Sequence, residues 1–191
     1  MNQLGNGLSG AGRIEESLHV EKAELAIMRR LGEPEDSILC SQANLACTYE
    51  TLGQKERALS LQRDVYFGFL KLYGISNIVT LQVANNYADL LNNLNLFEEA
   101  RSLFRETIPV ARRTLGDNNE DTIRMRWIYA QTLYKDATAT LDDLREAVTT
   151  LDETERIARR VFGGAHPLTV KIEDELRGAR AVLRAREAAP K

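Results

Sequence analysis

The chain has 191 residues, and its hydrophobic content of 43% is ordinary for a folded protein. Its 25 basic and 28 acidic residues are mixed along the sequence and give a net charge of -3, which argues against nucleic acid as a partner. No apolar stretch approaches the roughly 18 residues of a membrane span, and the N-terminal sequence lacks the order of a signal peptide. We therefore expect a cytoplasmic protein with no membrane partner.

A repeat of about 42 residues organises the chain. A glycine closes a basic and apolar run at Gly32, Gly74, Gly116 and Gly163, at intervals of 42, 42 and 47 residues. Small residues recur in step with these glycines in two series, which are Gly5, Ala46, Ala88 and Ala130, and then Ser17, Ala58, Ala100 and Ala147. Two antiparallel helices can approach closely where both carry small residues. The period therefore predicts one helix pair per unit.

The first two predicted units cover residues 1–36 and 37–78. The first begins partway through a helix, and an exposed apolar end near residues 1–5 would favour self-association. In the second, Cys40 and Cys47 lie seven residues apart, which is about 10 Å along a helix. A disulfide needs Cα atoms closer than about 7 Å, so we interpret these cysteines as small, half-buried residues.

The remaining units cover residues 79–120 and 121–167, followed by a capping helix at 168–191. Pro109 falls inside the second helix of its unit, which predicts a kink. Five extra residues lie between Ala130 and Ala147 and should lengthen a turn or extend a helix. The capping helix is mostly charged and has one apolar stripe, as expected of a solvated end of a helical stack; the stripe is Ile172, Leu176, Ala179 and Leu183.

Local capping signals agree with this division. Each glycine between units is suited to a left-handed helix C-cap and is followed by polar residues able to cap the next helix. Paired acids stand at predicted helix starts, where they complement the helix dipole; the pairs are Glu15 and Glu16, Glu98 and Glu99, and Asp142 and Asp143. No catalytic motif is present, and no motif calls for a cofactor or a metal. The sequence therefore predicts that the chain is not an enzyme.

Three segments resemble tetratricopeptide repeats, in particular the 42-residue variety of kinesin light chains. They are Gln-Ala-Asn-Leu-Ala-Cys-Thr-Tyr at 42–49, Leu-Gly-Gln-Lys-Glu-Arg-Ala-Leu at 52–59, and Phe-Glu-Glu-Ala at 97–100. The linker at 162–167, Phe-Gly-Gly-Ala-His-Pro, also looks like the linker of that variety. The resemblance covers nearly the whole chain. It implies an all-α, right-handed superhelical solenoid of antiparallel helix pairs that serves as a protein interaction scaffold or adaptor.

The resemblance also implies a binding groove, because the first helices of this family line a concave face. Carrying the inward positions over gives Asn44, Gln82, Asn85, Asn86, Asp89, Asn93, Arg124, Trp127, Gln131 and Lys135. The asparagine amides could hold the backbone of an extended peptide, Arg124 and Lys135 could pair with acidic side chains, and Trp127 offers a flat apolar anchor. Alternatively, these are polar residues on a hydrated face, and Trp127 packs between helices.

Two functions remain open at this point. The first is a binding module that holds a peptide or helix of a partner protein in this groove. The second is an assembly block that forms homo-oligomers through its N-terminal end or docks within a longer protein.

Overall fold

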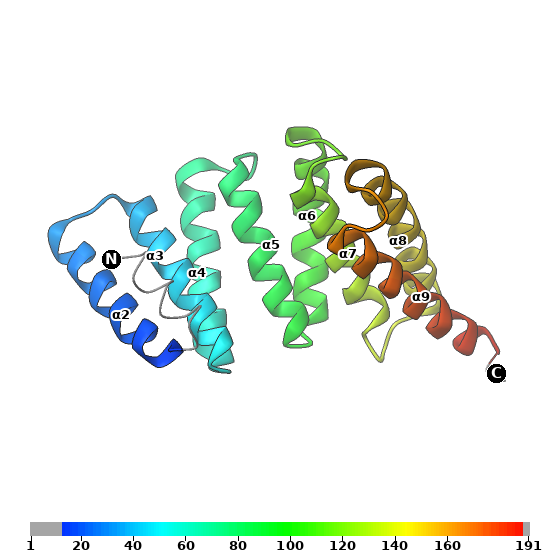
Figure 1. Ribbon diagram of the computed structural model, residues 1–191, viewed down its shortest axis with the longest axis horizontal. Helices are drawn as coiled ribbons and strands as arrows, with labels where there is room; N and C mark the ends of the chain where they lie inside the picture. Colours follow the sequence, from blue (N-terminus) through cyan, green and yellow to red (C-terminus); the bar gives the residue numbers. More distant parts are fainter. Residues whose placement is uncertain (1–12, 189–191) are drawn as a thin grey trace. The chain divides into compact units, whose positions relative to one another are not determined.

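The structure is a computed structural model that describes residues 13–188. It divides into an N-terminal unit that ends at Tyr87 and a C-terminal unit that begins at Ala88, so the division falls inside helix α5. All regular elements of the described residues are helices, which confirms the all-α prediction (Figure 1). The helices are α2 (Ile14–Leu31), α3 (Glu35–Thr51), α4 (Lys55–Tyr73), α5 (Ile78–Asn93), α6 (Phe97–Thr114), α7 (Glu120–Tyr134), α8 (Leu141–Phe162) and α9 (Pro167–Ala188).

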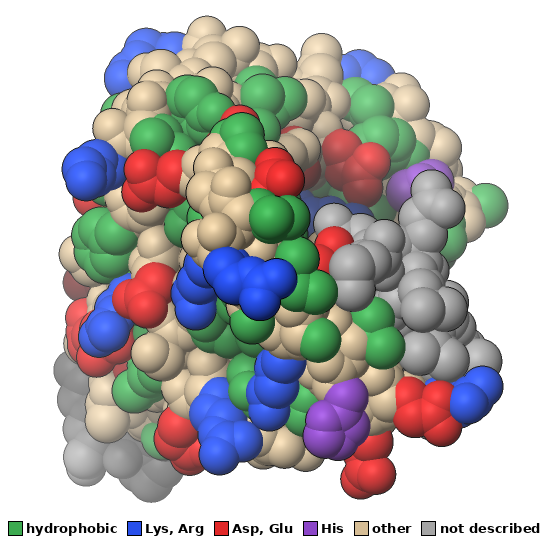
Figure 2. All heavy atoms as spheres, turned by 90° about the vertical axis from the view of Figure 1, so that its left-hand side faces the viewer, with side chains coloured by type: hydrophobic (Ala, Val, Ile, Leu, Met, Phe, Trp, Pro, Cys, Tyr) green, Lys and Arg blue, Asp and Glu red, His purple; other side chains and the backbone are tan. Residues whose placement is uncertain are grey.

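In the N-terminal unit, α2 packs on α3 and α3 packs on α4. The predicted small residues Ala46 and Ala58 have no exposed surface, as close helix packing requires. A Cβ atom on Gly68 of α4 would lie 2.6 Å from a methyl group of Leu39 on α3, so a larger residue here would require the Leu39 side chain to shift. On the face where α2 lies, basic, acidic and hydrophobic side chains are interspersed (Figure 2).

In the C-terminal unit, α6 packs on α7, α7 on α8, and α8 on α9. Ala130 and Ala147 are completely buried. The large apolar side chains buried in this unit include Phe104, Ile123, Leu133, Leu144 and Leu151. The apolar stripe of the last helix also faces this core, because Ile172, Leu176 and Ala179 are buried. Pro109 lies inside α6, as the sequence predicts.

The helix caps agree with the sequence only in part. Gly32 has the left-handed conformation that we predict, with φ 70° and ψ 35°. Gly74 and Gly163 also have positive φ, but their ψ values are 170° and 161°, so they are not left-handed caps. At both positions the glycine carbonyl instead accepts a hydrogen bond from the backbone N–H three residues later, at 3.4 Å.

The residue whose N–H donates this hydrogen bond is the N-terminal cap of the next helix. Asn77 and Asn119 each accept a hydrogen bond through the side-chain oxygen from the backbone N–H two residues later, at 2.8 Å. His166 does the same through Nδ1 at 3.2 Å. The linkers before α5, α7 and α9 therefore share one capping geometry.

The structure corrects the sequence interpretation of the two cysteines. Cys40 and Cys47 are free thiols, and both are exposed rather than half-buried. They lie on one side of α3, whereas its buried face is formed by other residues such as Leu39 and Leu45. The predicted apolar N-terminal end, with residues 1–5, lies outside the described residues.

The inserted residues both lengthen the turn between α7 and α8 and extend α8 at its start. The turn between α7 and α8 spans residues 135–140, whereas the turns before α4 and α6 span 52–54 and 94–96. In addition, α8 begins six residues before Ala147, whereas α6 begins three residues before Ala100. The insertion therefore adds a turn of helix as well as a longer loop.

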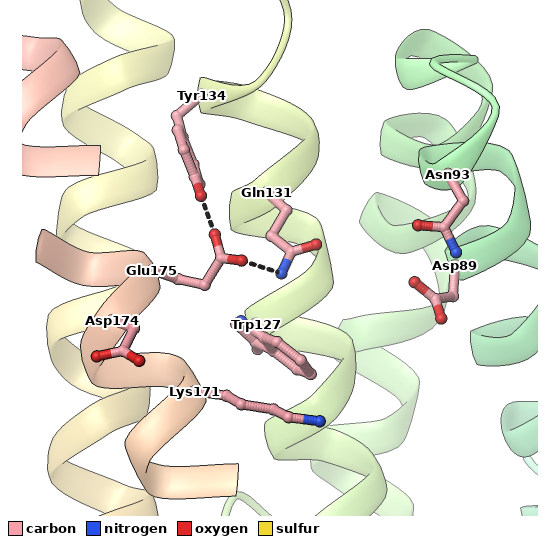
Figure 3. A pocket seen from close by; sticks show the side chains of 8 residues that line it. All are labelled: Asp89, Asn93, Trp127, Gln131, Tyr134, Lys171, Asp174 and Glu175. Atoms are coloured by element: carbon pink, nitrogen blue, oxygen red, sulfur yellow. Dashed lines mark hydrogen bonds between the residues drawn. The ribbon is translucent and has the colours of Figure 1, made fainter. Parts of the chain in front are cut away.

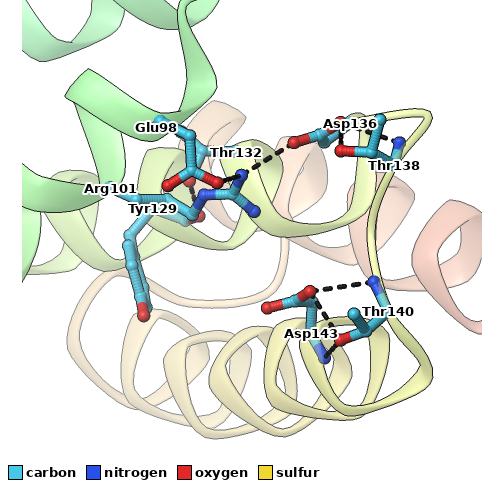
Figure 4. A network of polar contacts seen from close by, with 8 residues as sticks. All are labelled: Glu98, Arg101, Tyr129, Thr132, Asp136, Thr138, Thr140 and Asp143. Atoms are coloured by element: carbon cyan, nitrogen blue, oxygen red, sulfur yellow. Dashed lines mark hydrogen bonds and ion pairs between the residues drawn. The ribbon is translucent and has the colours of Figure 1, made fainter.

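A buried arginine anchors this longer loop (Figure 4). Arg101 of α6 is 4% exposed, and its Nη2 lies 2.7 Å from Oδ2 of Asp136 in the loop. The same guanidinium pairs with Glu98, whose side chain is exposed. Asp136 also accepts hydrogen bonds from the backbone N–H and the hydroxyl of Thr138, at 2.8 and 2.7 Å. The loop is thus tied to α6 through one charged contact.

The loop ends in a reciprocal cap of α8. The Thr140 hydroxyl accepts a hydrogen bond from the backbone N–H of Asp143, and the Asp143 carboxylate accepts bonds from the Thr140 backbone N–H and hydroxyl at 2.8 and 2.6 Å. These bonds from Thr140 hold the pKa of Asp143 below its usual value. The carboxylate must therefore be ionised for the cap to contribute fully.

Replacing Asp143 by alanine is expected to lower the stability of the fold by about 0.5–2 kcal/mol at neutral pH. Since the pKa is lowered in the folded protein, this contribution is present above the unfolded value of about 4 and is lost as the pH falls through the folded value. Urea denaturation at pH 7 and pH 3 measures the effect. The neighbouring Asp142→Ala variant is the control, and an equal cost for the two variants at pH 7 would contradict the cap assignment.

Candidate partner-binding cavity in the C-terminal unit

The C-terminal unit contains a cavity of 620 Å³ between the end of α5, α7 and α9 (Figure 3). Its volume falls in the range of about 300–1,000 Å³ that is common for ligand sites. The lining residues are Asp89, Asn93, Trp127, Gln131, Tyr134, Lys171, Asp174 and Glu175. Four of them, Asp89, Asn93, Trp127 and Gln131, belong to the groove that the sequence predicts.

Trp127 forms part of the cavity wall on α7. Its side chain is partly exposed, but its indole Nε1 is buried and has no hydrogen-bond partner within the described residues. The ring therefore has one edge inside the protein and also lines the cavity. A flat aromatic surface is thus available to a ligand.

A chain of hydrogen bonds fixes the acidic side of the cavity. Asn92 Nδ2 donates to Gln131 Oε1 at 3.0 Å, and Gln131 Nε2 donates to Glu175 Oε1 at 3.0 Å. The Tyr134 hydroxyl donates to the other oxygen of Glu175, and Lys135 Nζ lies 3.2 Å from Glu175 Oε1. Because Asn92 and Gln131 are buried, this chain holds the Glu175 carboxylate in one position on α9.

Asp89 lies across the cavity from Glu175, and its side chain, unlike that of Glu175, is not held by neighbouring side chains (Figure 3). It makes no hydrogen bond or ion pair with another described residue. Burial raises the pKa of Asp89, while the positive charges of Arg124 and Lys135 act against that rise. Burial likewise raises the pKa of Glu175 and lowers the pKa of Lys135, the latter against the charge of Asp89. The cavity therefore contains a carboxylate without a direct partner.

The other predicted groove residues lie elsewhere. Arg124 is exposed on α7 and pairs with Glu120 at 3.1 Å, and Lys135 is exposed just after α7. The remaining four belong to the N-terminal unit. Asn44 on α3 is partly exposed, Gln82 and Asn86 on α5 are exposed, and Asn85 is buried with Oδ1 unpaired within the described residues. None of these six lines the cavity.

Sequence reasoning missed the contribution of the last helix. Lys171, Asp174 and Glu175 of α9 line the cavity, although the sequence suggested only a solvated cap. Their spacing carried a signal, because positions 171, 174 and 175 share one helix face beside the apolar stripe. Tyr134, at the end of α7, also lines the cavity and was not among the ten predicted residues.

The part of the chain that the structure describes contains no group of three or more His, Cys, Asp or Glu side chains placed to hold a metal ion. None of its helices combines the length and the apolar character needed to cross a membrane.

Comparisons with known proteins show a family match over one part of the chain and a likeness of fold over nearly all of it. Residues 80–121 match the tetratricopeptide repeat family. A crystal structure of a singly substituted form of putative kinesin light chain nearly identical TPR-like repeats from Podosopora anserina has a TM-score of 0.81 at 20% identity, over 97% of this chain and 85% of that one. A crystal structure of BtubC (BKLC) from P. vanneervenii has a TM-score of 0.65 at 13% identity, over 98% and 81% of the two chains. A search of curated proteins found no match.

The helix pairs and these likenesses define an all-helical repeat protein, a class whose stacked units commonly present binding surfaces and are typically not enzymes. The chain carries a tetratricopeptide repeat and has the fold of kinesin light chain-like tetratricopeptide arrays, as the sequence resemblance predicted.

Proposed function

We propose that this chain is a protein interaction scaffold without catalytic activity, and that it binds a peptide segment of a partner protein through the cavity of its C-terminal unit. The observation that carries the proposal is the cavity itself, where four of the residues that the family resemblance implies line a space of 620 Å³. The pre-positioned Glu175 and the flat face of Trp127 support it further, since a site that is already ordered loses little entropy on binding.

The cavity favours a peptide segment over a small metabolite. It is open to solvent on a helical surface and combines amide, carboxylate, ammonium and aromatic groups. Asn93 is exposed there, and its amide can both donate to and accept from a peptide backbone. Assembly through the N-terminal end remains the alternative function, but it falls on residues 1–12, outside the described part of the chain.

Replacing Asp89 and Asn93 together by alanine is expected to weaken binding of cavity-directed peptides by about tenfold or more, because two polar contacts are lost. The measurement is a random-peptide display selection on the parent chain, followed by affinities of the enriched peptides for the variant.

A matched control carries Asp64→Ala and Asn118→Ala, which remove one exposed carboxylate and one exposed amide that do not line the cavity. Circular dichroism verifies that both variants are folded. If no peptide is enriched, or if enriched peptides bind the two variants equally well, the cavity is not the binding site.

A further inference from the structure

We infer that the cavity of the C-terminal unit accepts an arginine side chain of the partner segment, with its guanidinium between Asp89 and Glu175 and against the face of Trp127. This inference rests on the proposed function and specifies the chemistry of the residue that the site selects. Sequence reasoning suggested the reverse, an acidic ligand that pairs with Arg124 and Lys135. Those two cations do not line the cavity, whereas three carboxylates do.

The charges that line the cavity favour a cation. Asp89, Asp174 and Glu175 contribute three carboxylates, and Lys171 is the one basic residue among the eight lining side chains. Asp174 is paired with Arg177 and Glu175 with Lys135, so their charges are partly neutralised. Asp89 has no such partner among the described residues, and its raised pKa reflects the cost of burying an unpaired carboxylate. A bound cation would remove that cost.

The geometry favours a planar cation. Glu175 comes from α9 and Asp89 from α5, with the Trp127 ring on α7 between the two helices (Figure 3). A guanidinium group has five N–H donors in one plane, so it can bond carboxylates at its edge while its face stacks on an indole. An ammonium group is a compact charge and can satisfy only part of this arrangement. The site should therefore prefer arginine to lysine.

Glu175 is well suited to this role because it does not need to move. Its carboxylate is already held by the hydrogen bond from Gln131 and by the hydroxyl of Tyr134. The pair Asn92 and Gln131 connects this carboxylate to the end of α5, the helix that also carries Asp89. Two acceptors on different helices are thus positioned before a ligand arrives, which is the condition for selective recognition.

The experiment uses the one tryptophan of the chain, Trp127, as a fluorescent reporter inside the site. The full chain is titrated with blocked pentapeptides of sequence Gly-Ser-Xaa-Ser-Gly, in which the central residue Xaa is arginine, citrulline or glutamate. Citrulline has nearly the shape of arginine but no charge. Arginine is expected to bind at least about tenfold more tightly than citrulline, because it alone forms charge-assisted hydrogen bonds.

Two variants with opposite expected effects separate recognition from a general loss of packing. Asp89→Asn should weaken binding of the arginine peptide about fivefold or more, and Lys171→Met should strengthen it about twofold to fivefold by removing a like charge. Asp64→Asn in the N-terminal unit removes one exposed carboxylate and is the matched control, with no expected change. A role in packing alone would not give effects of opposite sign.

The outcomes distinguish this inference from the proposed function. Equal affinity for arginine and citrulline, no saturable response to any of the pentapeptides, or equal behaviour of Asp89→Asn and Asp64→Asn would overturn the inference. If the display selection still yields cavity-dependent peptides without enriched arginine, the proposed function stands and the arginine site does not. If it yields no cavity-dependent peptide, the proposed function itself fails.

Discussion

Replacing Arg101 by methionine is expected to lower the free energy of unfolding of the C-terminal unit by about 3–5 kcal/mol. The Arg101 side chain is 5% exposed, and that of its partner Asp136 is 12% exposed. Methionine keeps most of the aliphatic stem, so the cost comes chiefly from leaving the Asp136 carboxylate without its countercharge in a largely buried position. The loop that contains the insertion would lose its anchor to α6. Urea denaturation followed by Trp127 fluorescence measures the loss.

The same guanidinium offers an internal control. Glu98 also pairs with Arg101, but its side chain is 82% exposed. Glu98→Gln should therefore cost no more than about 1 kcal/mol, as is usual for exposed ion pairs. If Arg101→Met costs as little as Glu98→Gln, the two hydrogen bonds from Thr138 are sufficient to hold Asp136, and the loop does not depend on the buried charge.

Replacing Phe104 by alanine should also be severe, with a loss of about 3–5 kcal/mol. The Phe104 ring is completely buried on α6 and meets Tyr129 of α7 edge to face, with the ring centroids 6.3 Å apart. Removing it leaves a cavity at the junction of α6 and α7 that the surrounding helices cannot fill by small shifts. The same denaturation experiment reports on it, since Trp127 also lies on α7.

Phe67 provides the matched comparison for this substitution. It lies on α4 and is 55% exposed, so Phe67→Ala removes the same atoms without opening a buried space. We expect a change of less than about 1 kcal/mol. Similar losses for the two variants, with the unfolding of each unit followed separately, would mean that the α6 and α7 junction relaxes around the missing ring.

The fold could be predicted because several independent signals repeat in register. Ala130 and Ala147, the glycines between units and the cap residues Asn77 and Asn119 each mark a position at which only a few residue types satisfy the backbone or the packing. Insertions do not erase such a pattern. The five extra residues before Ala147 changed the spacing but left both small residues at the helix crossing.

The candidate site could be predicted only in part, because the tertiary fold decides how deeply a side chain is buried and which partner its polar group finds. The family resemblance assigns Asn86 and Asn93 alike to the groove-facing side of one helix, but only Asn93 lines the cavity. The sequence also predicts that the last helix only caps the helical stack, whereas Glu175 of that helix is held in the site by a hydrogen bond from Gln131. Helical spacing identifies which residues share a face. It does not say which of their charges find partners.

The cap at the start of α9 differs chemically from its two counterparts. Asn77 and Asn119 accept their hydrogen bonds through amide oxygens, which keep their lone pairs at any ordinary pH. His166 accepts through Nδ1, so this ring must carry its proton on Nε2 for the bond to exist. Of these three caps, the one that begins the helix bearing Lys171, Asp174 and Glu175 is the one that depends on the tautomer of a histidine ring.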